Sequence, residues 1–373
     1  MNKKILIATG IYPPEIGGPA GYAKNLAEKF AEKNINVCVI TYSDDKFYEI
    51  DEDLPYKLIR IKRINKISNY FRYFFALLKN IKNFDIVYAF DYVSAGIPSV
   101  LACKIFQKKF VIRSGGDFIW ESYLDKYKKG VKLKDFYELK LHRKFLLKFF
   151  ISKIVLNLCD AIIFTTKFQE KIFEKPYNIN PKKVFYISNP IIINDSIQIK
   201  ENKNNNILFA GRIIEKGNVL NLIKAFSSLN QDGFNLVIIG DGYQKKYLEV
   251  YVKNNNIKNI IFENGILNKD LRQTISDSYA MIFPSYTDIS PNTVLDCIST
   301  KTPFILTEEH GFDWFKNDVL EFDPSSINSI KNAIEKIMNE DFYNQAKNIV
   351  EGINYKYSYD DVLNNTLEIF KKI

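Results

Sequence analysis

The chain has 373 residues, a formal net charge of +9 and 46% apolar side chains. This length exceeds what one hydrophobic core usually organises, so we expect two domains of ordinary size. No stretch of eighteen or more residues is apolar and uncharged enough to span a bilayer, which argues against a membrane-spanning protein. The apolar run at Ile5 reaches Pro13 and Pro14 too early for a secretory signal, so we interpret it as a first strand.

The first half of the chain alternates short β-branched runs with helical patterns. This alternation predicts an α/β fold with a parallel, doubly wound sheet. The expected strands are Lys4–Ala8, Val37–Thr41, Leu58–Ile61, Ile86–Phe90, Phe110–Arg113, Ala161–Thr165 and Val184–Ile187.

A second cycle of the same kind follows a polar, asparagine-rich stretch at 196–206, which we interpret as an interdomain linker. The expected strands of this cycle lie near Ile207–Ala210, Asn235–Ile239, Ile260–Phe262, Ala280–Phe283 and Phe304–Leu306. The sequence therefore predicts two Rossmann-like domains, 1–195 and 207–356, that face each other across a cleft.

The four cysteines are far apart in the sequence, at Cys38, Cys103, Cys159 and Cys297. No Cys-x-x-Cys spacing occurs, and the chain has only two histidines. This usage predicts buried, reduced thiols in a cytosolic protein and no metal site.

Positive charge is concentrated in the first part of the chain. Residues 1–200 contain 34 Lys and Arg against 20 Asp and Glu, whereas residues 201–373 contain 18 against 23. The cations gather in Arg60–Lys82 and Lys126–Lys153, which are also rich in aromatic residues. Helices with one cationic and one apolar side suit an anionic membrane surface, so both segments are candidate membrane contacts.

Two alternatives remain for these basic segments. They could be ordinary amphipathic helices whose aromatic side is core and whose lysines are solvated. Nucleic-acid binding is disfavoured, because the segments follow no known nucleic-acid module and the second half of the chain is acidic.

Ligands of parallel sheets bind outside the carboxyl ends of the strands, so the turns after the strands are the candidate sites. After the first strand, Gly17 and Gly18 let the backbone approach a ligand before a helix that we expect from about Tyr22. A turn without a binding role is the alternative at this position.

The first strand of the second domain is followed by Gly211-Arg212 and then by Lys216-Gly217. A diphosphate leaving group develops negative charge as a glycosidic bond breaks, and a guanidinium with an ammonium can stabilise that charge. The alternative is a surface turn in which Lys216 pairs with Glu215.

A helix start is expected at Ser290-Pro291, with Ser290 as the N-cap and Pro291 as the first helical residue. The amides of Asn292 and Thr293 would then point out of the helix end, where they can bind phosphate oxygens.

Two aspartates flank this predicted helix start. Asp296 shares a helix face with Asn292 and Thr293 and could accept the hydroxyls of a ribose, and Asp288 is placed to hold a sugar hydroxyl. Capping of the helix start by both carboxylates is the alternative.

Taken together, these motifs resemble glycosyltransferase family 4, the retaining GT-B enzymes that use nucleotide-sugar donors. The resemblance covers nearly the whole chain. It rests on Gly17-Gly18, Ile187-Ser188-Asn189-Pro190, Leu208-Phe209-Ala210-Gly211-Arg212, Lys216-Gly217, Ile238-Ile239-Gly240-Asp241-Gly242, Phe283-Pro284-Ser285 and Asn292-Thr293-Val294-Leu295-Asp296.

The resemblance implies roles for individual residues. Arg212 and Lys216 correspond to the diphosphate-binding pair of the family. Asp288 and Asp296 occupy the acidic positions of its E-x(7)-E element, although both are one methylene shorter than the usual glutamates. The family often has a histidine where Gly115 falls, which makes Asp117 the nearest candidate to contact the transferred sugar or accept the acceptor's proton.

The resemblance also implies the chemistry and the domain roles. Anomeric configuration would be retained, with the departing phosphate deprotonating the incoming hydroxyl and with no metal or other cofactor. Residues 1–195 would bind the acceptor, 207–356 would bind the nucleotide sugar, and the last helix in 357–373 would pack back on the first domain.

We therefore expect a cytoplasmic hexosyltransferase, peripheral on the inner face of the membrane, that transfers a sugar to a lipid-linked or cell-envelope glycan acceptor in polysaccharide or lipopolysaccharide biosynthesis. One alternative is a sugar-nucleotide-binding GT-B protein without transfer activity, which the two shorter carboxylates keep open. A GT-B epimerase would need acid/base carboxylates and histidines around the cleft, and a glycan phosphorylase would need a lysine for pyridoxal phosphate. Neither pattern stands out.

Overall fold

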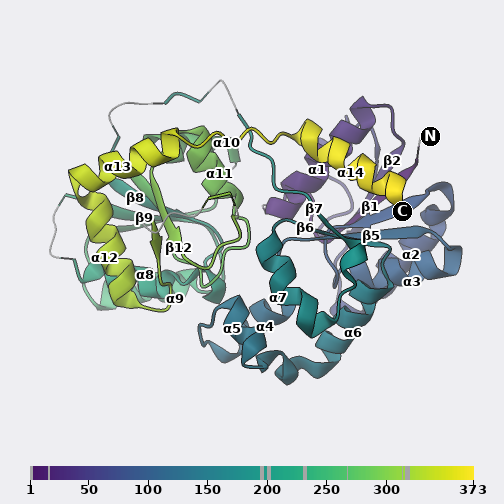
Figure 1. Cartoon of the computed structure of the whole chain (residues 1–373), viewed down its shortest axis with the longest axis horizontal. Coiled ribbons are helices and arrows are strands. Elements are labelled where there is room, and N and C mark those ends of the chain that lie inside the picture. Colours follow the sequence, from purple (N-terminus) through teal and green to yellow (C-terminus); the bar gives the residue numbers. More distant parts are fainter. Residues whose placement is uncertain are drawn as a thin grey trace. The chain divides into compact units, whose positions relative to one another are not determined.

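The computed structural model describes residues 3–15, 17–193, 197–199, 203–229, 233–266, 268–312, 314–315 and 320–373 (Figure 1). It divides into two compact units. The first contains Met1–Phe118, Arg143–Pro190 and Tyr357–Ile373, and the second contains Ile119–His142 and Ile191–Lys356. Each unit is built on one parallel sheet with helices on its faces, so the expected α/β class with two doubly wound sheets is confirmed.

The sheet of the first unit has the strand order β3-β2-β1-β4-β5-β6-β7. Its strands are β1 Ile5–Thr9, β2 Val37–Ser43, β3 Lys57–Lys62, β4 Ile86–Ala89, β5 Lys109–Ser114, β6 Ala161–Phe164 and β7 Val184–Tyr186. All seven expected strands are present. β1 pairs with β2 on one side and β4 on the other, so the strand order reverses direction beside β1.

Helices of eleven to fifteen residues connect most of these strands. They are α1 Gly18–Glu32, α2 Lys66–Asn80, α3 Gly96–Phe106, α6 Leu146–Leu158 and α7 Lys167–Tyr177. The last helix of the chain, α14 Tyr359–Lys372, also belongs to this unit. Short 3-10 turns occur at Glu49–Asp51, Ile81–Asn83, Leu141–Phe145 and Pro181–Lys183. The start of α1 was expected near Tyr22 but lies at Gly18, because Pro19 occupies the first turn, where its missing N–H costs nothing.

The C-terminal helix α14 packs on α1, as the resemblance implied (Figure 1). Phe30 of α1 and Phe370 of α14 stack with ring centroids 6.5 Å apart. Both rings join alternate side chains of the sheet, such as Ile5 and Ile7, in one buried cluster. A reciprocal cap at Ser358 begins α14, because its hydroxyl accepts the N–H of Asp361 while the Asp361 carboxylate accepts the N–H of Ser358.

The sheet of the second unit has the order β10-β9-β8-β11-β12-β13. Its strands are β8 Asn206–Ala210, β9 Asn235–Ile239, β10 Ile260–Glu263, β11 Ala280–Phe283, β12 Phe304–Thr307 and β13 Glu321–Phe322. The first five match the expected strands. The sequence did not predict β13, because two residues carry no periodic signal.

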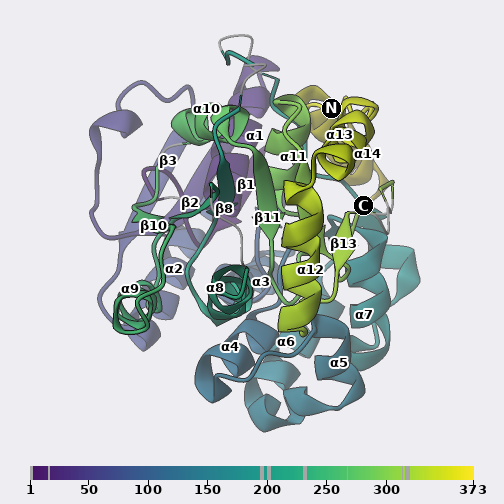
Figure 2. The ribbon, with the colours of Figure 1, turned by 90° about the vertical axis from the view of Figure 1, so that its left-hand side faces the viewer.

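The second unit contains α8 Val219–Ser227, α9 Lys245–Asn254, α10 Asn268–Asp277, α11 Asn292–Ser299, α12 Ile327–Met338 and α13 Glu340–Glu351. A 3-10 turn lies at Glu215–Gly217. Helices α8 and α12 lie side by side on the sheet (Figure 2). The expected linker falls partly outside the described residues, at 196 and 200–202, and its last residue, Asn206, begins β8.

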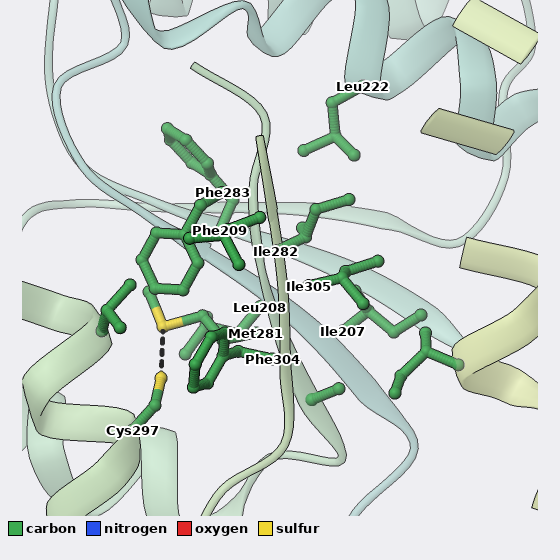
Figure 3. Packing of buried hydrophobic residues seen from close by; sticks show 14 of the residues in the cluster. Ile207, Leu208, Phe209, Leu222, Met281, Ile282, Phe283, Cys297, Phe304 and Ile305 are labelled. Carbon is green, nitrogen blue, oxygen red and sulfur yellow. Dashed lines mark hydrogen bonds between the residues drawn. The ribbon is translucent and has the colours of Figure 1, made fainter. Parts of the chain in front are cut away.

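The core of the second unit lies between its sheet and helices (Figure 3). Leu208, Met281 and Phe304 project from three neighbouring strands and are fully buried. Each such side chain contributes about 1.5–3 kcal/mol through the apolar surface that it removes from water. Cys297 of α11 lies 3.4 Å from the sulfur of Met281, and all four cysteines are free and buried, as their spacing predicts.

None of the helices in the described ranges is both long and apolar enough to cross a membrane.

Candidate active site

The turns after β8 and β11 form the candidate site. These strands are neighbours in the sheet, and the chain continues from β8 to β9 on one side and from β11 to β12 on the other. The carboxyl ends of strands at such a reversal open a crevice in which parallel sheets bind ligands. Arg212 and Lys216 follow β8, and Asp288 follows β11.

The glycine-rich turn after β9 supports the turn that carries Arg212. Gly240 has φ +146°, and a Cβ atom there would lie 1.9 Å from the carbonyl oxygen of Gly211. Only glycine adopts this backbone conformation at such a close approach. The N–H of Ile213 also donates to the carbonyl of Asp241 at 2.9 Å. The backbone around Arg212 is therefore held by a second turn.

Arg212 and Lys216 converge on one carboxylate, that of Glu121. Its Oε2 lies 3.2 Å from Nη2 of Arg212, and its Oε1 lies 3.5 Å from Nζ of Lys216. Glu121 belongs to α4 (Phe118–Tyr127), which precedes α5 (Leu133–Glu138). Burial by itself would raise the pKa of Glu121, but the charges of Lys216 and Arg212 outweigh it and hold the pKa below its usual value. The two predicted cations are thus brought together by an acid that sequence reasoning missed.

Lys216 is held at both its backbone and its side chain. Its carbonyl accepts the N–H of Tyr286 at 3.2 Å, which joins the turn after β8 to the turn after β11. Its ammonium lies 5.8 Å from the ring centroid of Trp120, the residue before Glu121. The side chain of Lys216 is only 20% exposed, whereas that of Arg212 is 64% exposed.

Asp288 lies in the same electrostatic environment. Its N–H donates to the carbonyl of Glu309 at 2.9 Å, and its backbone forms a bridge with His310. Burial raises the pKa of Asp288, while the charge of Lys216 acts in the opposite direction. The structure therefore brings Asp288 into the electrostatic environment of Lys216.

His310 ties this turn to β13. Its Nδ1 accepts the N–H of Phe312 at 3.2 Å, so Nε2 carries the proton and donates to Glu321 at 3.0 Å. The imidazole is buried. We interpret His310 as a support for the turn that contains Asp288.

Helix α11 starts one residue later than expected. Pro291 is its N-cap, with ψ 124°, and Asn292 is its first residue. The prediction of Ser290 as N-cap and Pro291 as first helical residue is therefore wrong. The extended ψ of Pro291 excludes it from the helix, although its φ of −70° suits either position. Asn292 and Thr293 still supply first-turn amides that point out of the helix end.

Asp296 contacts a partner that the sequence did not indicate. Its Oδ1 lies 3.7 Å from Nη1 of Arg272 in α10, and both side chains are largely buried. Burial raises the pKa of Asp296 to about 6, against the opposing charge of Arg272. The role of Asp296 at a ribose stays a prediction.

The remaining predicted residues belong to the first unit. Gly17 precedes α1, and a Cβ atom at this position would lie 2.8 Å from Cδ1 of Ile11. Asp117 is 1% exposed in the turn after β5. Gln169 supports this turn by donating to the Gly116 carbonyl at 3.2 Å. The roles of Gly17, Gly18 and Asp117 toward a ligand stay predictions.

Residues 119–142 were expected in the first domain, yet they pack on the second unit. Asp125 accepts the hydroxyl of Tyr243 at 2.6 Å, and the N–H of Leu133 donates to Thr287 at 2.9 Å. Lys132 lies 3.0 Å from Asp323. Part of the predicted membrane segment Lys126–Lys153 is therefore engaged within the protein.

The described chain has the architecture of a nucleotide-binding α/β protein, with a cation pair at the reversal point of its second sheet. Residues 16–195 match the model of Glycosyltransferase Family 4, and residues 192–354 match that of Glycosyl transferases group 1. The chain belongs to this family of GT-B glycosyltransferases.

Two curated relatives illustrate the range of the family. The O-antigen chain mannosyltransferase RfbU of Salmonella typhimurium is 25% identical over 50% of this chain and 54% of its own length. An α-1,4-N-acetyl-D-galactosaminyltransferase of Campylobacter jejuni, whose name specifies a PP-undecaprenol-linked acceptor, is 24% identical over 65% of this chain and 63% of its own. The matches therefore span between about half and two thirds of these relatives.

Solved structures share the fold over nearly the whole chain. HepE from Anabaena in complex with UDP-glucose superposes with a TM-score of 0.77 and 12% identity, and covers 100% of both chains. The lipopolysaccharide outer core galactosyltransferase WaaB has a TM-score of 0.68 and 17% identity, with 99% of this chain and 100% of its own covered. At these identities the similarity establishes the fold alone.

Proposed function

We propose that the protein is a retaining glycosyltransferase that moves a hexosyl unit from a nucleoside-diphosphate sugar to a hydroxyl of a lipid-linked or cell-envelope glycan. The observation that carries this proposal is the convergence of Arg212 and Lys216 at the carboxyl end of β8, in a chain of this family. Paired cations at the reversal point of a parallel sheet suit a diphosphate.

The cation pair would act mainly on the leaving group. As the bond between sugar and phosphate breaks, negative charge grows on the diphosphate, and Arg212 and Lys216 would stabilise it. A preorganised donor of this kind contributes about 2–4 kcal/mol to the transition state. The first-turn amides of α11 would add the positive end of a helix dipole.

The carboxylates would orient the donor. Asp288 would hold a hydroxyl of the transferred sugar, and Asp296 would accept the ribose hydroxyls. The departing phosphate would take the proton of the incoming hydroxyl on the same face of the sugar, which retains the anomeric configuration. We propose that transfer is metal-independent, because Arg212 and Lys216 supply the positive charge that a metal would otherwise bring.

We further propose that the first unit lies against an anionic membrane. One side of α2 exposes Ile67, Phe71 and Phe75, each 57–73% exposed, while Tyr73 and Leu77 on the opposite side are fully buried. Ile64, two residues before the helix, is also exposed. The aromatic residues of this segment are therefore only partly core. An exposed apolar stripe flanked by cations matches an interfacial helix.

Two further helices extend this exposed apolar surface. α3 packs against both α2 and α6. It exposes Leu101 and Ile105, and α6 exposes Leu146, Leu147, Phe150, Ile154 and Leu158. Arg60, in contrast, is buried against Asp51 at 2.7 Å and cannot reach a lipid surface. The candidate membrane surface thus lies on α2, α3 and α6.

A lipid-linked acceptor would reside in such a membrane. The names of the Salmonella and Campylobacter relatives refer to an O-antigen chain and a PP-undecaprenol glycan, which supports an acceptor of this kind.

Donor turnover tests the proposed function. The purified protein is incubated with a panel of UDP-, GDP- and ADP-sugars and a membrane extract, and release of the nucleoside diphosphate is measured. We expect release from one donor, and loss of release in Arg212→Ala. A protein that binds a nucleoside diphosphate but releases it from no sugar nucleotide would contradict the proposal.

A further inference from the structure

Glu121 occupies the position between Arg212 and Lys216 with both of its carboxylate oxygens. Oε2 contacts the guanidinium and Oε1 contacts the ammonium, at 3.2 Å and 3.5 Å. Among the residues that the structure describes, no carboxylate other than that of Glu121 has an oxygen within 4.0 Å of a side-chain nitrogen of Arg212 or Lys216. A single anion bridging two cations has the geometry that a bound phosphate group would also require.

A diphosphate bound by Arg212 and Lys216 would compete with the Glu121 carboxylate for these cations. Like charges a few ångströms apart in a partly buried site repel strongly, and each cation gains most from one close anion. A donor that binds Arg212 and Lys216 must therefore take the place of Glu121.

The structure allows the carboxylate to leave while its helix stays in place. The side chain of Glu121 is 21% exposed, so it has access to solvent. Its neighbour Trp120 is 1% exposed and donates its indole N–H to the carbonyl of Val131 at 2.8 Å. Asp125, on the next turn of α4, accepts the hydroxyl of Tyr243. α4 is thus anchored by residues other than Glu121.

We propose that Glu121 is a displaceable internal anion, which occupies the diphosphate-binding cations in the free protein and is expelled when the diphosphate binds. This inference rests on the proposed function, because it assumes that Arg212 and Lys216 bind the diphosphate. Glu121 then sets the affinity of the site. Competition from its carboxylate weakens the binding of both the donor and the nucleoside diphosphate product. As the product leaves, the carboxylate takes over the contacts with Arg212 and Lys216.

Calorimetric titration with inorganic pyrophosphate tests the inference without knowledge of the base or the sugar. In Glu121→Gln the side chain keeps its size and loses its charge, and we expect pyrophosphate to bind about tenfold more tightly than to the wild type. Glu138→Gln is the matched control, because Glu138 lies in the same segment, is 62% exposed and, among the residues that the structure describes, pairs with Lys134 in its own helix. The affinity of Glu138→Gln for pyrophosphate should equal that of the wild type.

A second set of variants shows whether the effect passes through the cations. In an Arg212→Ala/Lys216→Ala background, the added Glu121→Gln change should leave the affinity for pyrophosphate unaltered. Glu121→Ala should also bind pyrophosphate more tightly than the wild type does. This variant controls for an interaction made by the introduced glutamine itself. Circular dichroism and thermal unfolding confirm that each variant is folded.

The outcomes separate the inference from the proposed function. Equal or weaker pyrophosphate binding by Glu121→Gln, including no binding by either protein, overturns the displaceable-anion inference. A wild-type affinity in the Arg212→Ala/Lys216→Ala variant instead overturns the assignment of the cations to the diphosphate.

Discussion

Asp296 and Arg272 form a largely buried ion pair, with 3.7 Å between Oδ1 and Nη1. The pair joins α11 to α10 beside the helix start that is proposed to bind phosphate. Nε of Arg272 is buried and has no hydrogen-bond partner within the described residues. The carboxylate proposed to hold a ribose is therefore also a structural ligand of Arg272, and its charge state affects both folding and binding.

This pair predicts a pH-dependent component of stability. Burial raises the pKa of Asp296 from 3.8 to about 6, so between these values the folded protein binds more protons than the unfolded chain. Stability from this group therefore falls as the pH rises from about 4 to about 6. Asp296→Asn removes this titrating group. The free energy of unfolding of the variant minus that of the wild type should therefore rise by about 1–3 kcal/mol as the pH increases from about 4 to about 6. Urea unfolding at several pH values measures it, and a constant difference would contradict it.

The same residue predicts a selective loss of nucleotide binding. A hydrogen bond to a charged group contributes about 1.5–3 kcal/mol, so Asp296→Ala should weaken nucleoside diphosphate binding roughly tenfold or more. Pyrophosphate, which has no ribose, should bind as to the wild type. Titrations with both ligands test this prediction, and an equal loss for the two would show that the substitution disturbs the phosphate site instead.

Arg212→Ala should lower turnover by about 2–4 kcal/mol of transition-state stabilisation, because the guanidinium is proposed to stabilise the developing charge of the leaving group. The control is Lys331→Ala, which removes a cation that pairs with Glu335 at 3.5 Å within α12. Steady-state kinetics with the donor identified in the panel measure both variants. An unchanged kcat/KM in Arg212→Ala would remove this residue from the site.

Gly240→Ala should damage the turn that carries Arg212. The new Cβ atom would meet the Gly211 carbonyl at 1.9 Å, in addition to the strain of φ +146°. Gly233→Ala is the control, because Gly233 also has a positive φ, of +105°, but no heavy atom of the described residues beyond its chain neighbours lies within 4 Å of the added carbon. We expect the Gly233 variant to lose about 1 kcal/mol of stability through strain alone. The Gly240 variant should lose more and also bind pyrophosphate more weakly, and equal losses would mean that the close approach is unimportant.

Apolar residues of α2 and α6 should contribute to membrane binding. Phe75→Ser with Phe150→Ser removes two rings that are 57% and 61% exposed, and we expect sedimentation with vesicles of anionic phospholipid to fall about tenfold or more. Phe47→Ser is the control, because Phe47 is 57% exposed but lies outside these helices. A similar loss of vesicle binding in the double variant and in Phe47→Ser, or no loss in either, would contradict this assignment of the surface.

Much of the architecture could be predicted from local sequence patterns. Runs such as Val37–Ile40 are apolar throughout because strands of a covered parallel sheet are buried on both faces, and this pattern is visible without tertiary information. Glycines and cations directly after strands, as at Gly211 and Arg212, likewise mark the carboxyl edge of a sheet. The class of fold and the position of the cation pair follow from such signals.

Only the tertiary structure decided which groups meet these residues. Glu121 lies 91 residues before Arg212 and within helix α4 instead of directly after a strand, so no spacing rule connects them. Arg272 and Asp296 come from separate helices, and the division of α2 into buried and exposed aromatics depends on what packs against it. Periodicity encodes whether a residue is buried, whereas the identity of its partner is set by packing between distant segments. The sequence by itself thus determined the fold class and the cations, and the tertiary structure decided which carboxylate occupies them.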